Sequence, residues 1–219
     1  MGATAGDERV ILYLIRHGET AYNRDRLGLG RADVPLTTLG ERQAAAIGAR
    51  LAREPIERIL VSPLGRAIAT AQAVRGERPI ELEIRDELLE LDVGVTEGMT
   101  FPDMRERHPD FFAAWVGVDG ADTVMPGGES LRHVYERVAP LIGELRAAPE
   151  GVVAVVSHNF VTKVAICQLL GLELDAWRSF STDIASVSIF DLRDGRAITR
   201  ALNDTCHLEM DSGGGSTSG

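Results

Sequence analysis

The sequence has little lysine, cysteine or side-chain amide. Lys163 is the only lysine among 23 basic residues, and asparagine and glutamine occur three times each. This bias is typical of a GC-rich genome. Heat adaptation through loss of thermolabile amides is the alternative, but that adaptation usually comes with more lysine, and this chain has almost none. The two cysteines, Cys167 and Cys206, form no CxxC motif, which argues against a zinc ribbon or a redox motif. We expect both to be free thiols.

Long apolar runs and an excess of positive charge are also absent. No apolar stretch approaches the ~20 residues that a bilayer crossing requires, so we expect no membrane span. The chain carries 23 basic and 33 acidic residues, a net charge of −10, which disfavours general nucleic-acid binding. Residues 1–10 lack a basic stretch followed by an apolar core, so we expect no secretory signal and a cytoplasmic protein.

The order of apolar runs and helical patterns indicates an α/β fold. With 219 residues, the chain is long enough for one sizeable domain or two small ones. Expected strands alternate with expected helices, which favours a three-layer α/β/α sandwich around a mostly parallel sheet. The strands are expected at 10–15, 59–61, 80–84 and 152–156, and the helices at 38–53, 64–74, 101–118 (one or two), 129–145 and 158–170.

The C-terminal part adds an antiparallel element and a tail. Asp194-Gly195 lies between two apolar runs, 187–192 and 197–202, which predicts a hairpin. Residues 211–219 are rich in Ser and Gly and are expected to be a flexible tail. We therefore assign residues 1–210 to a single domain.

Candidate catalytic residues follow three of the expected buried strands. Arg16-His17 follows the first, Ser62–Arg66 the second and Ser157-His158 the third. In open α/β sheets, ligands bind beyond the carboxyl ends of the strands. A single histidine at such a place is more often structural, but two at equivalent ends favour a site. Arginine suits phosphate because its planar fork gives paired, charge-assisted hydrogen bonds.

Several sequence blocks then occur in a defined order. They are Leu14-Ile15-Arg16-His17-Gly18-Glu19-Thr20 with Asn23, Asp33–Thr37 with Gly40 and Gln43, Ser62–Ala67 with Thr70-Ala71, Leu89-Glu90 with Gly94 and Glu97-Gly98, Pro126–Ser130, Val156–His158, and Asn203–Thr205 with His207-Leu208. Together they resemble the histidine phosphatase superfamily, the phosphoglycerate mutase-like proteins. The resemblance runs from about Leu12 to Leu208 and implies the phosphoglycerate mutase-like fold.

The resemblance implies a role for each matching residue. His17 corresponds to the nucleophile that accepts the phosphoryl group, and Glu90 to the acid that protonates the departing alcohol. Arg16, Arg66 and His158 correspond to groups that hold the phosphate oxygens. Asn23 corresponds to an assisting ligand. Glu97, the competing acid, is assigned to a structural turn.

Physical chemistry adds conditions to these roles. A nucleophilic imidazole must be neutral at the attacking nitrogen, and a backbone partner near Gly18 can fix its tautomer. Two arginines and a second imidazole, if protonated, can take the place of metal ions. Glu90 needs a raised pKa, which partial burial and a nearby dianionic phosphate both favour.

The sequence departs from the family pattern on the inferred pocket wall. Leu29 stands where glutamine is often found, and Asn159 follows His158 where glycine is usual. We expect both residues to contact the substrate and to affect its identity. The segment 99–128, which contains four large aromatic residues, is expected either to pack as core or to form a lid over the pocket.

The function that follows is a metal-independent phosphatase acting on a small phosphate monoester. A phosphoglycerate mutase is the alternative, because it shares every catalytic residue. A non-catalytic phosphate-binding module is a third reading, disfavoured because all the catalytic positions are present. The sequence shows no HxH or HExxH spacing, so we expect neither metal nor cofactor. Homodimers occur among relatives, although the residues themselves give no argument for one.

Overall fold

The run Val10–Ile15 lies in strand β1, and alternate side chains of this strand enter two different hydrophobic cores. Leu12 and Leu14 pack in one core, whereas Tyr13 and Ile15 pack in the other. Successive side chains of a strand point to opposite faces of its sheet, so β1 has to be covered on both sides. The expectation of a strand buried on both faces is therefore confirmed.

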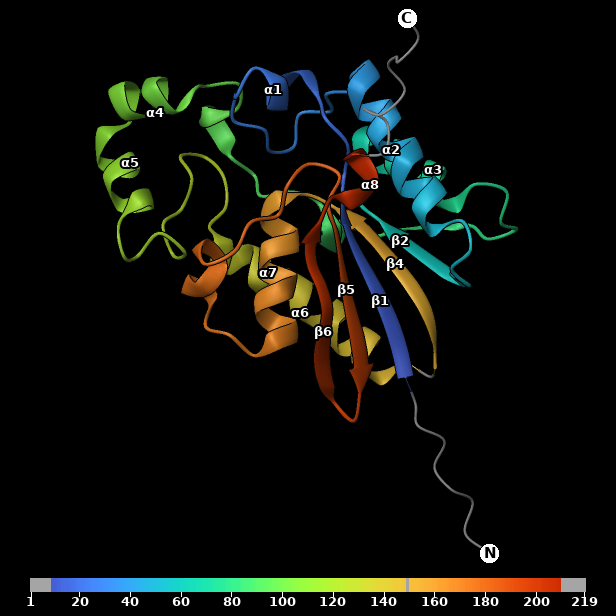
Figure 1. The fold of residues 1–219 in the computed structure, drawn as a ribbon. Helices are drawn as coiled ribbons and strands as arrows, with labels where there is room; N and C mark the ends of the chain where they lie inside the picture. The colour runs from blue at the N-terminus through green and yellow to red at the C-terminus, as the bar shows by residue number, and fades with distance from the viewer. Residues whose placement is uncertain (1–8, 149, 210–219) are drawn as a thin grey trace, which may run out of the picture.

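The computed structural model describes residues 9–148 and 150–209, which contain one mixed sheet (Figure 1). The strands lie in the order β3-β2-β4-β1-β5-β6. Strands β1 to β4 are parallel to their neighbours in this set, whereas β5 is antiparallel to β1 and β6 is antiparallel to β5. The strand bounds are β1 Arg9–Arg16, β2 Arg58–Val61, β3 Leu82–Ile84, β4 Gly151–Ser157, β5 Val187–Arg193 and β6 Arg196–Asp204.

Helices cover both faces of the sheet, which confirms the three-layer α/β/α arrangement. Residues of α2 and α3 belong to one core, and residues of α6 and α7 belong to the other. No helix within the described residues has both the length and the apolar character needed to cross a membrane. The helix bounds are α1 Ala21–Arg24, α2 Thr38–Leu51, α3 Gly65–Arg75, α4 Phe101–Arg107, α5 Pro109–Val116, α6 Leu131–Ala147, α7 Asn159–Leu170 and α8 Cys206–Glu209.

The parallel strands β2, β4 and β1 are neighbours and end at the same edge of the sheet. Arg16 pairs in register with Ser157, and Val61 pairs with Val156. The residues that follow these strand ends are His17, Ser62 and His158. The strand order therefore brings together side chains that are far apart in the sequence.

The expected lid segment 99–128 contains two short helices, α4 and α5. Figure 1 shows them at one side of the molecule, farther from the sheet than α7. Thr100 caps the first helix, where its hydroxyl accepts from the backbone N–H of Asp103. His108 ends α4, and Pro109 begins α5, because proline fits the first turn of a helix but disrupts its interior.

The hairpin between β5 and β6 turns at Asp194 and Gly195 as expected. Both residues have positive φ, 50° and 70°, which the two-residue turn of a twisted hairpin requires.

Several boundaries and elements differ from the sequence expectations. His158 caps α7 and is not part of it, and α6 begins at Leu131 and not at 129. Strand β3 is shorter than 80–84, and the short helices α1 and α8 were not expected. The expected tail, 211–219, lies outside the described residues.

Candidate active site

His17 is held by its backbone and by its ring. Its N–H donates to the Ser157 carbonyl at 3.0 Å, and its carbonyl accepts from the Ala185 N–H at 3.0 Å. The side chain is 2% exposed, and Nδ1 lies 2.7 Å from the Gly18 carbonyl oxygen. A carbonyl oxygen can only accept, so Nδ1 carries the proton and Nε2 keeps its lone pair. Nε2 accepts from Nε of Arg66 at 3.3 Å.

The turn after His17 is fixed by close backbone packing. A Cβ on Gly18 would collide with the carbonyl of Gly40, which lies in the first turn of α2. The Gly18 N–H donates to Oγ1 of Thr70 on α3 at 3.2 Å. Glycine is therefore required at position 18 for close approach, and this contact fixes the carbonyl that orients the imidazole.

His158 lies beside His17 and is fully buried. The two ring centroids are 5.0 Å apart with an interplanar angle of 62°. Nε2 of His158 lies 2.7 Å from Oγ of Ser62, the residue that follows β2. Its Nδ1 is buried and has no hydrogen-bond partner among the described residues. The expectation that both imidazoles converge at one sheet edge is confirmed.

Arg66 reaches from α3 to the imidazole of His17 and is fully buried. Its terminal nitrogens donate to the carbonyls of Ala32 at 2.7 Å and Gly30 at 2.6 Å. The carboxylate of Glu97 holds the same loop by accepting from the backbone N–H groups of Gly30, Arg31 and Ala32 at 2.8 to 3.1 Å. Glu97 thus has the structural contacts that the resemblance assigns to it.

Arg16 is the last residue of β1 and directly precedes His17. Its Nη1 donates to the Thr182 carbonyl at 2.6 Å and to Oδ1 of Asn159 at 3.2 Å. The Thr182 hydroxyl donates to the same amide oxygen at 2.8 Å. Nε of Arg16 is buried without a partner among the described residues, so this donor remains available to an anion.

The electrostatics of the site favour a neutral imidazole at His17. Burial, followed by the charges of Arg66 and Arg16, holds the pKa of His17 well below its ordinary value. Burial and the same positive surroundings also hold the pKa of His158 well below its ordinary value. The direction of this shift favours a neutral His158 in the site without its anion, so the condition that His158 is protonated is not favoured in that state. Arg16 and Arg66 are then the cationic side chains beside His17.

Glu90, the expected acid, is also buried, with 3% of its surface exposed. Its Oε1 accepts from the Leu91 N–H at 2.8 Å, and its Oε2 accepts from the Phe160 N–H at 3.2 Å. Burial raises its pKa and outweighs the opposing effects of these N–H groups and of Arg66 and Arg16. A carboxyl group with a raised pKa is suited to general acid catalysis.

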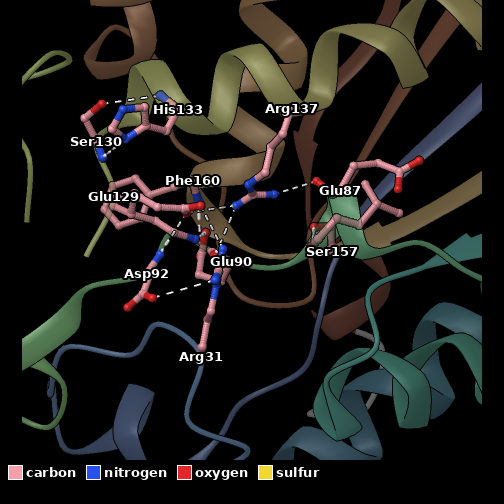
Figure 2. A network of polar contacts seen from close by, with 12 residues as sticks. Arg31, Glu87, Glu90, Asp92, Glu129, Ser130, His133, Arg137, Ser157 and Phe160 are labelled. Carbon is pink, nitrogen blue, oxygen red and sulfur yellow. Dashed lines mark hydrogen bonds and ion pairs between the residues drawn. The ribbon is translucent and has the colours of Figure 1, made fainter. Parts of the chain in front are cut away.

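Two arginines hold the main chain of Glu90 from opposite sides (Figure 2). Arg31 donates to the Glu90 carbonyl oxygen at 3.3 Å, and Arg137 from α6 donates to it at 3.2 Å. The carboxylate of Glu129 pairs with both, at 2.8 Å and 3.3 Å, and accepts from the Asp92 N–H at 3.2 Å. We call Arg31, Arg137 and Glu129 the Glu90 clamp.

A cavity of about 820 Å³ opens beside these groups. Six of the eight residues expected at the site line it: Arg16, His17, Asn23, Leu29, Glu90 and Asn159. The other two, Arg66 and His158, are fully buried around His17 and are absent from the cavity wall. Within residues 9–148 and 150–209, acidic, histidine and cysteine side chains form no group of three or more that could hold a metal ion.

Comparison with known protein families shows to which family the chain with this site belongs. The family model described as "histidine phosphatase superfamily (branch 1)" matches residues 12–205. The chain belongs to the histidine phosphatase superfamily. This match covers strands β2 to β6, β1 from Leu12 onward, and every residue of the site described above.

Named relatives of this histidine phosphatase include both phosphatases and mutases. It is 34% identical over 200 residues to phosphoserine phosphatase 1 of Hydrogenobacter thermophilus, covering 91% of this chain and 94% of that one. It is 30% identical over 204 residues to a Salmonella choleraesuis protein named probable phosphoglycerate mutase GpmB, covering 90% and 94%. The crystal structure of alpha-ribazole phosphatase from Shigella flexneri superimposes with a TM-score of 0.81 at 30% identity, covering 89% and 96%.

The aromatic residues of α4 and α5 serve both purposes that the sequence left open. Trp115 is 6% exposed and packs against Trp177 and Phe160, with ring centroids 5.6 Å and 5.8 Å away. Trp115, Phe111 and Phe101 also line the cavity. Trp115 and Phe111 are therefore both core and pocket wall, whereas Phe101 belongs to the pocket wall alone.

Sequence reasoning missed several groups that hold the expected site residues of this histidine phosphatase. Thr182 holds Arg16 through a backbone carbonyl, and Phe160 holds Glu90 through a backbone N–H. Backbone groups leave no signal in residue identity. Arg137 was missed because arginine is abundant in this chain. Glu129 belongs to the sequence block Pro126–Ser130 of the family resemblance, but it was given no role of its own.

Proposed function

We propose that this protein is a phosphatase that hydrolyses small phosphate monoesters through a phosphohistidine on Nε2 of His17. One observation carries the proposal. The Gly18 carbonyl fixes the proton on Nδ1, and burial beside two arginines favours an unprotonated Nε2 on a histidine that lines the cavity. Glu90, an acid with a raised pKa, lies on the wall of the same cavity.

In the first step, the lone pair on Nε2 of His17 attacks phosphorus, and the bond from phosphorus to the ester oxygen breaks. The ester oxygen takes the proton of the Glu90 carboxyl group and departs as an alcohol. The phosphorylated imidazole carries a positive charge. Its Nδ1–H continues to donate to the Gly18 carbonyl oxygen, which stabilises that charge.

In the second step, a water molecule replaces the alcohol. The Glu90 carboxylate takes a proton from this water while its oxygen attacks phosphorus. The bond between phosphorus and Nε2 breaks, and the electron pair returns to the imidazole of His17. Inorganic phosphate leaves with both Glu90 and His17 back in their starting protonation states.

The positive charge of the site stabilises the phosphoryl oxygens in both steps. Nε of Arg66 lies 3.3 Å from the attacking nitrogen, so it will contact a phosphoryl group bound there. The unpartnered Nε of Arg16 and Nδ1 of His158 are further ligands, and Asn23 assists from the cavity wall. Leu29 and Asn159 contact the substrate from the cavity wall.

The segment 99–128 acts as the lid of the pocket in this proposal, because residues of α4 and α5 form one wall. The place of action is the cytoplasm. Both cysteines are free, and Cys206 is exposed, which agrees with a reducing compartment.

Trapping of the intermediate tests the proposal. Rapid acid-free quenching of the enzyme with a ³²P-labelled ester should give a label that is stable in base and labile in acid, as phosphohistidine is. The His17→Ala variant should give neither label nor phosphate release, with an unchanged circular dichroism spectrum. Equal labelling of that variant would refute the mechanism. Conversion of 3- to 2-phosphoglycerate without phosphate release would identify a mutase.

A further inference from the structure

The lining of the cavity is mostly apolar. Arg16, His17 and Glu90 line it where the phosphoryl group is expected, and the other polar lining residues are Asn23, Arg26, Thr96, Asn159, Asp183 and Thr205. The remaining lining residues are apolar or glycine. Helices α4 and α5 contribute a wall of Phe101, Met104, Phe111 and Trp115, and Leu29 and Val93 also line the cavity.

The aromatic part of this wall is supported from behind. Trp115 is stacked on Phe111 with a centroid distance of 6.1 Å and an interplanar angle of 27°. Trp177 packs against Trp115, and Phe160 lies edge-on to both indole rings at 5.8 Å. A wall built from mutually packed rings offers an ordered apolar surface at little further entropic cost to a ligand.

The cavity has few charged side chains that could bind a second anionic group of a substrate. Beyond Arg16 and Glu90, the charged lining side chains among the described residues are Arg26 and Asp183, and both are exposed. Asp183 already accepts from the Asn203 side-chain amide at 2.8 Å. An exposed ion pair contributes little, and a carboxylate placed against the apolar wall would lose hydration without compensation.

We propose that the leaving group of the preferred ester is an uncharged apolar alcohol large enough to reach the aromatic wall. This inference rests on the proposed phosphatase function and specifies its substrate class. A volume of about 820 Å³ is in the range that holds drug-sized ligands, whereas a three-carbon acid leaves most of it empty. Amino-acid and hydroxy-acid phosphates are therefore poor substrates of this site.

Steady-state kinetics with matched esters tests the substrate class. The series is 3-phenylpropyl phosphate, propyl phosphate and phosphoserine, which all have alkyl leaving groups, with p-nitrophenyl phosphate as a general reporter of activity. We expect kcat/KM for 3-phenylpropyl phosphate to exceed that for propyl phosphate at least about tenfold, because a phenyl ring leaves water. Phosphoserine should be slower than 3-phenylpropyl phosphate.

Two outcomes overturn the inference in distinguishable ways. Turnover of phosphoserine or propyl phosphate at least as fast as 3-phenylpropyl phosphate refutes the apolar leaving group and leaves the phosphatase function standing. No hydrolysis of any ester, including p-nitrophenyl phosphate, refutes the proposed function itself.

A matched pair of variants locates the preference on the wall. Phe101 is 59% exposed and lines the cavity, whereas Val118 is 85% exposed, lies in the same segment and does not line it. Phe101→Ser should lower the ratio of kcat/KM for 3-phenylpropyl over propyl phosphate about fivefold, as expected for loss of partial ring burial. Val118→Ser should leave the ratio unchanged. An unchanged ratio in Phe101→Ser would refute the assignment of this wall.

Discussion

Substitution of Arg137 by methionine should weaken acid catalysis without touching the phosphate site. Arg137 donates to the carbonyls of Glu87 at 2.6 Å and Glu90 at 3.2 Å and pairs with Glu129 at 3.3 Å (Figure 2). Methionine keeps the apolar stem but removes all three contacts. The main chain of Glu90 then loses one of the two arginines that hold it.

The expected changes in the free energy of unfolding and in kcat follow from these contacts. Hydrogen bonds from a charged donor contribute about 1.5–3 kcal/mol each, and the Arg137 side chain is 20% exposed. We expect a loss of about 2–4 kcal/mol in the free energy of unfolding, because water replaces part of the bonding. General acid catalysis contributes roughly 10²- to 10⁴-fold. Partial misplacement of Glu90 should therefore lower kcat for propyl phosphate about tenfold.

The choice of leaving group separates this effect from general damage. p-Nitrophenolate departs without needing a proton, so kcat for p-nitrophenyl phosphate should stay within about twofold of the wild-type value. Arg132→Met is the matched control, because Arg132 lies on the same helix and forms an exposed ion pair with Asp122. It should change neither rate. An equal fall with both esters in Arg137→Met would refute a positioning role for the Glu90 clamp.

Two further predictions concern pH and packing. The pKa of His17 is held well below its ordinary value, so turnover should persist as the pH falls through 6.5. The pKa of Glu90 is raised, so turnover of alkyl esters should fall as the pH rises through the pKa of Glu90, where the acid loses its proton. A pH–rate profile that loses its alkaline limb in Glu90→Gln checks this, and a profile unaffected by that substitution contradicts it. Gly18→Ala should lower the free energy of unfolding by about 1–3 kcal/mol and reduce kcat, because its Cβ meets the Gly40 carbonyl. Gly143→Ala, in open space on α6, should raise stability by about 0.5–1 kcal/mol, and chemical denaturation of the pair measures both; equal effects would contradict the packing argument.

The strands and most helices were predictable because their signals are local. Val10–Ile15 and Val152–Val156 are apolar runs that can be satisfied only inside a sheet covered on both faces. Asp194-Gly195 predicts its own turn, since both residues tolerate positive φ. The ends of helices were less accurate. His158 lies outside the helix assigned to it, and α6 begins two residues later than expected, because capping geometry depends on neighbouring segments.

The candidate site was predictable only in part. Position after a buried strand was enough to select His17 and His158, whereas Glu90 is one of 33 acidic residues and was found through resemblance alone. The charge of His158 could not be predicted, because its pKa depends on burial and on the arginines packed around it.

By itself, the sequence determined which chemistry the chain carries, because reactive side chains and strand-forming runs are written in residue identity. The tertiary structure decided what each group can do. Sheet order places His17 beside His158, and the Gly18 carbonyl selects the tautomer. Burial then sets the direction of each pKa shift, and α4 and α5 supply an apolar pocket wall. These properties depend on distances between segments remote in sequence, and such distances exist only once the chain has folded.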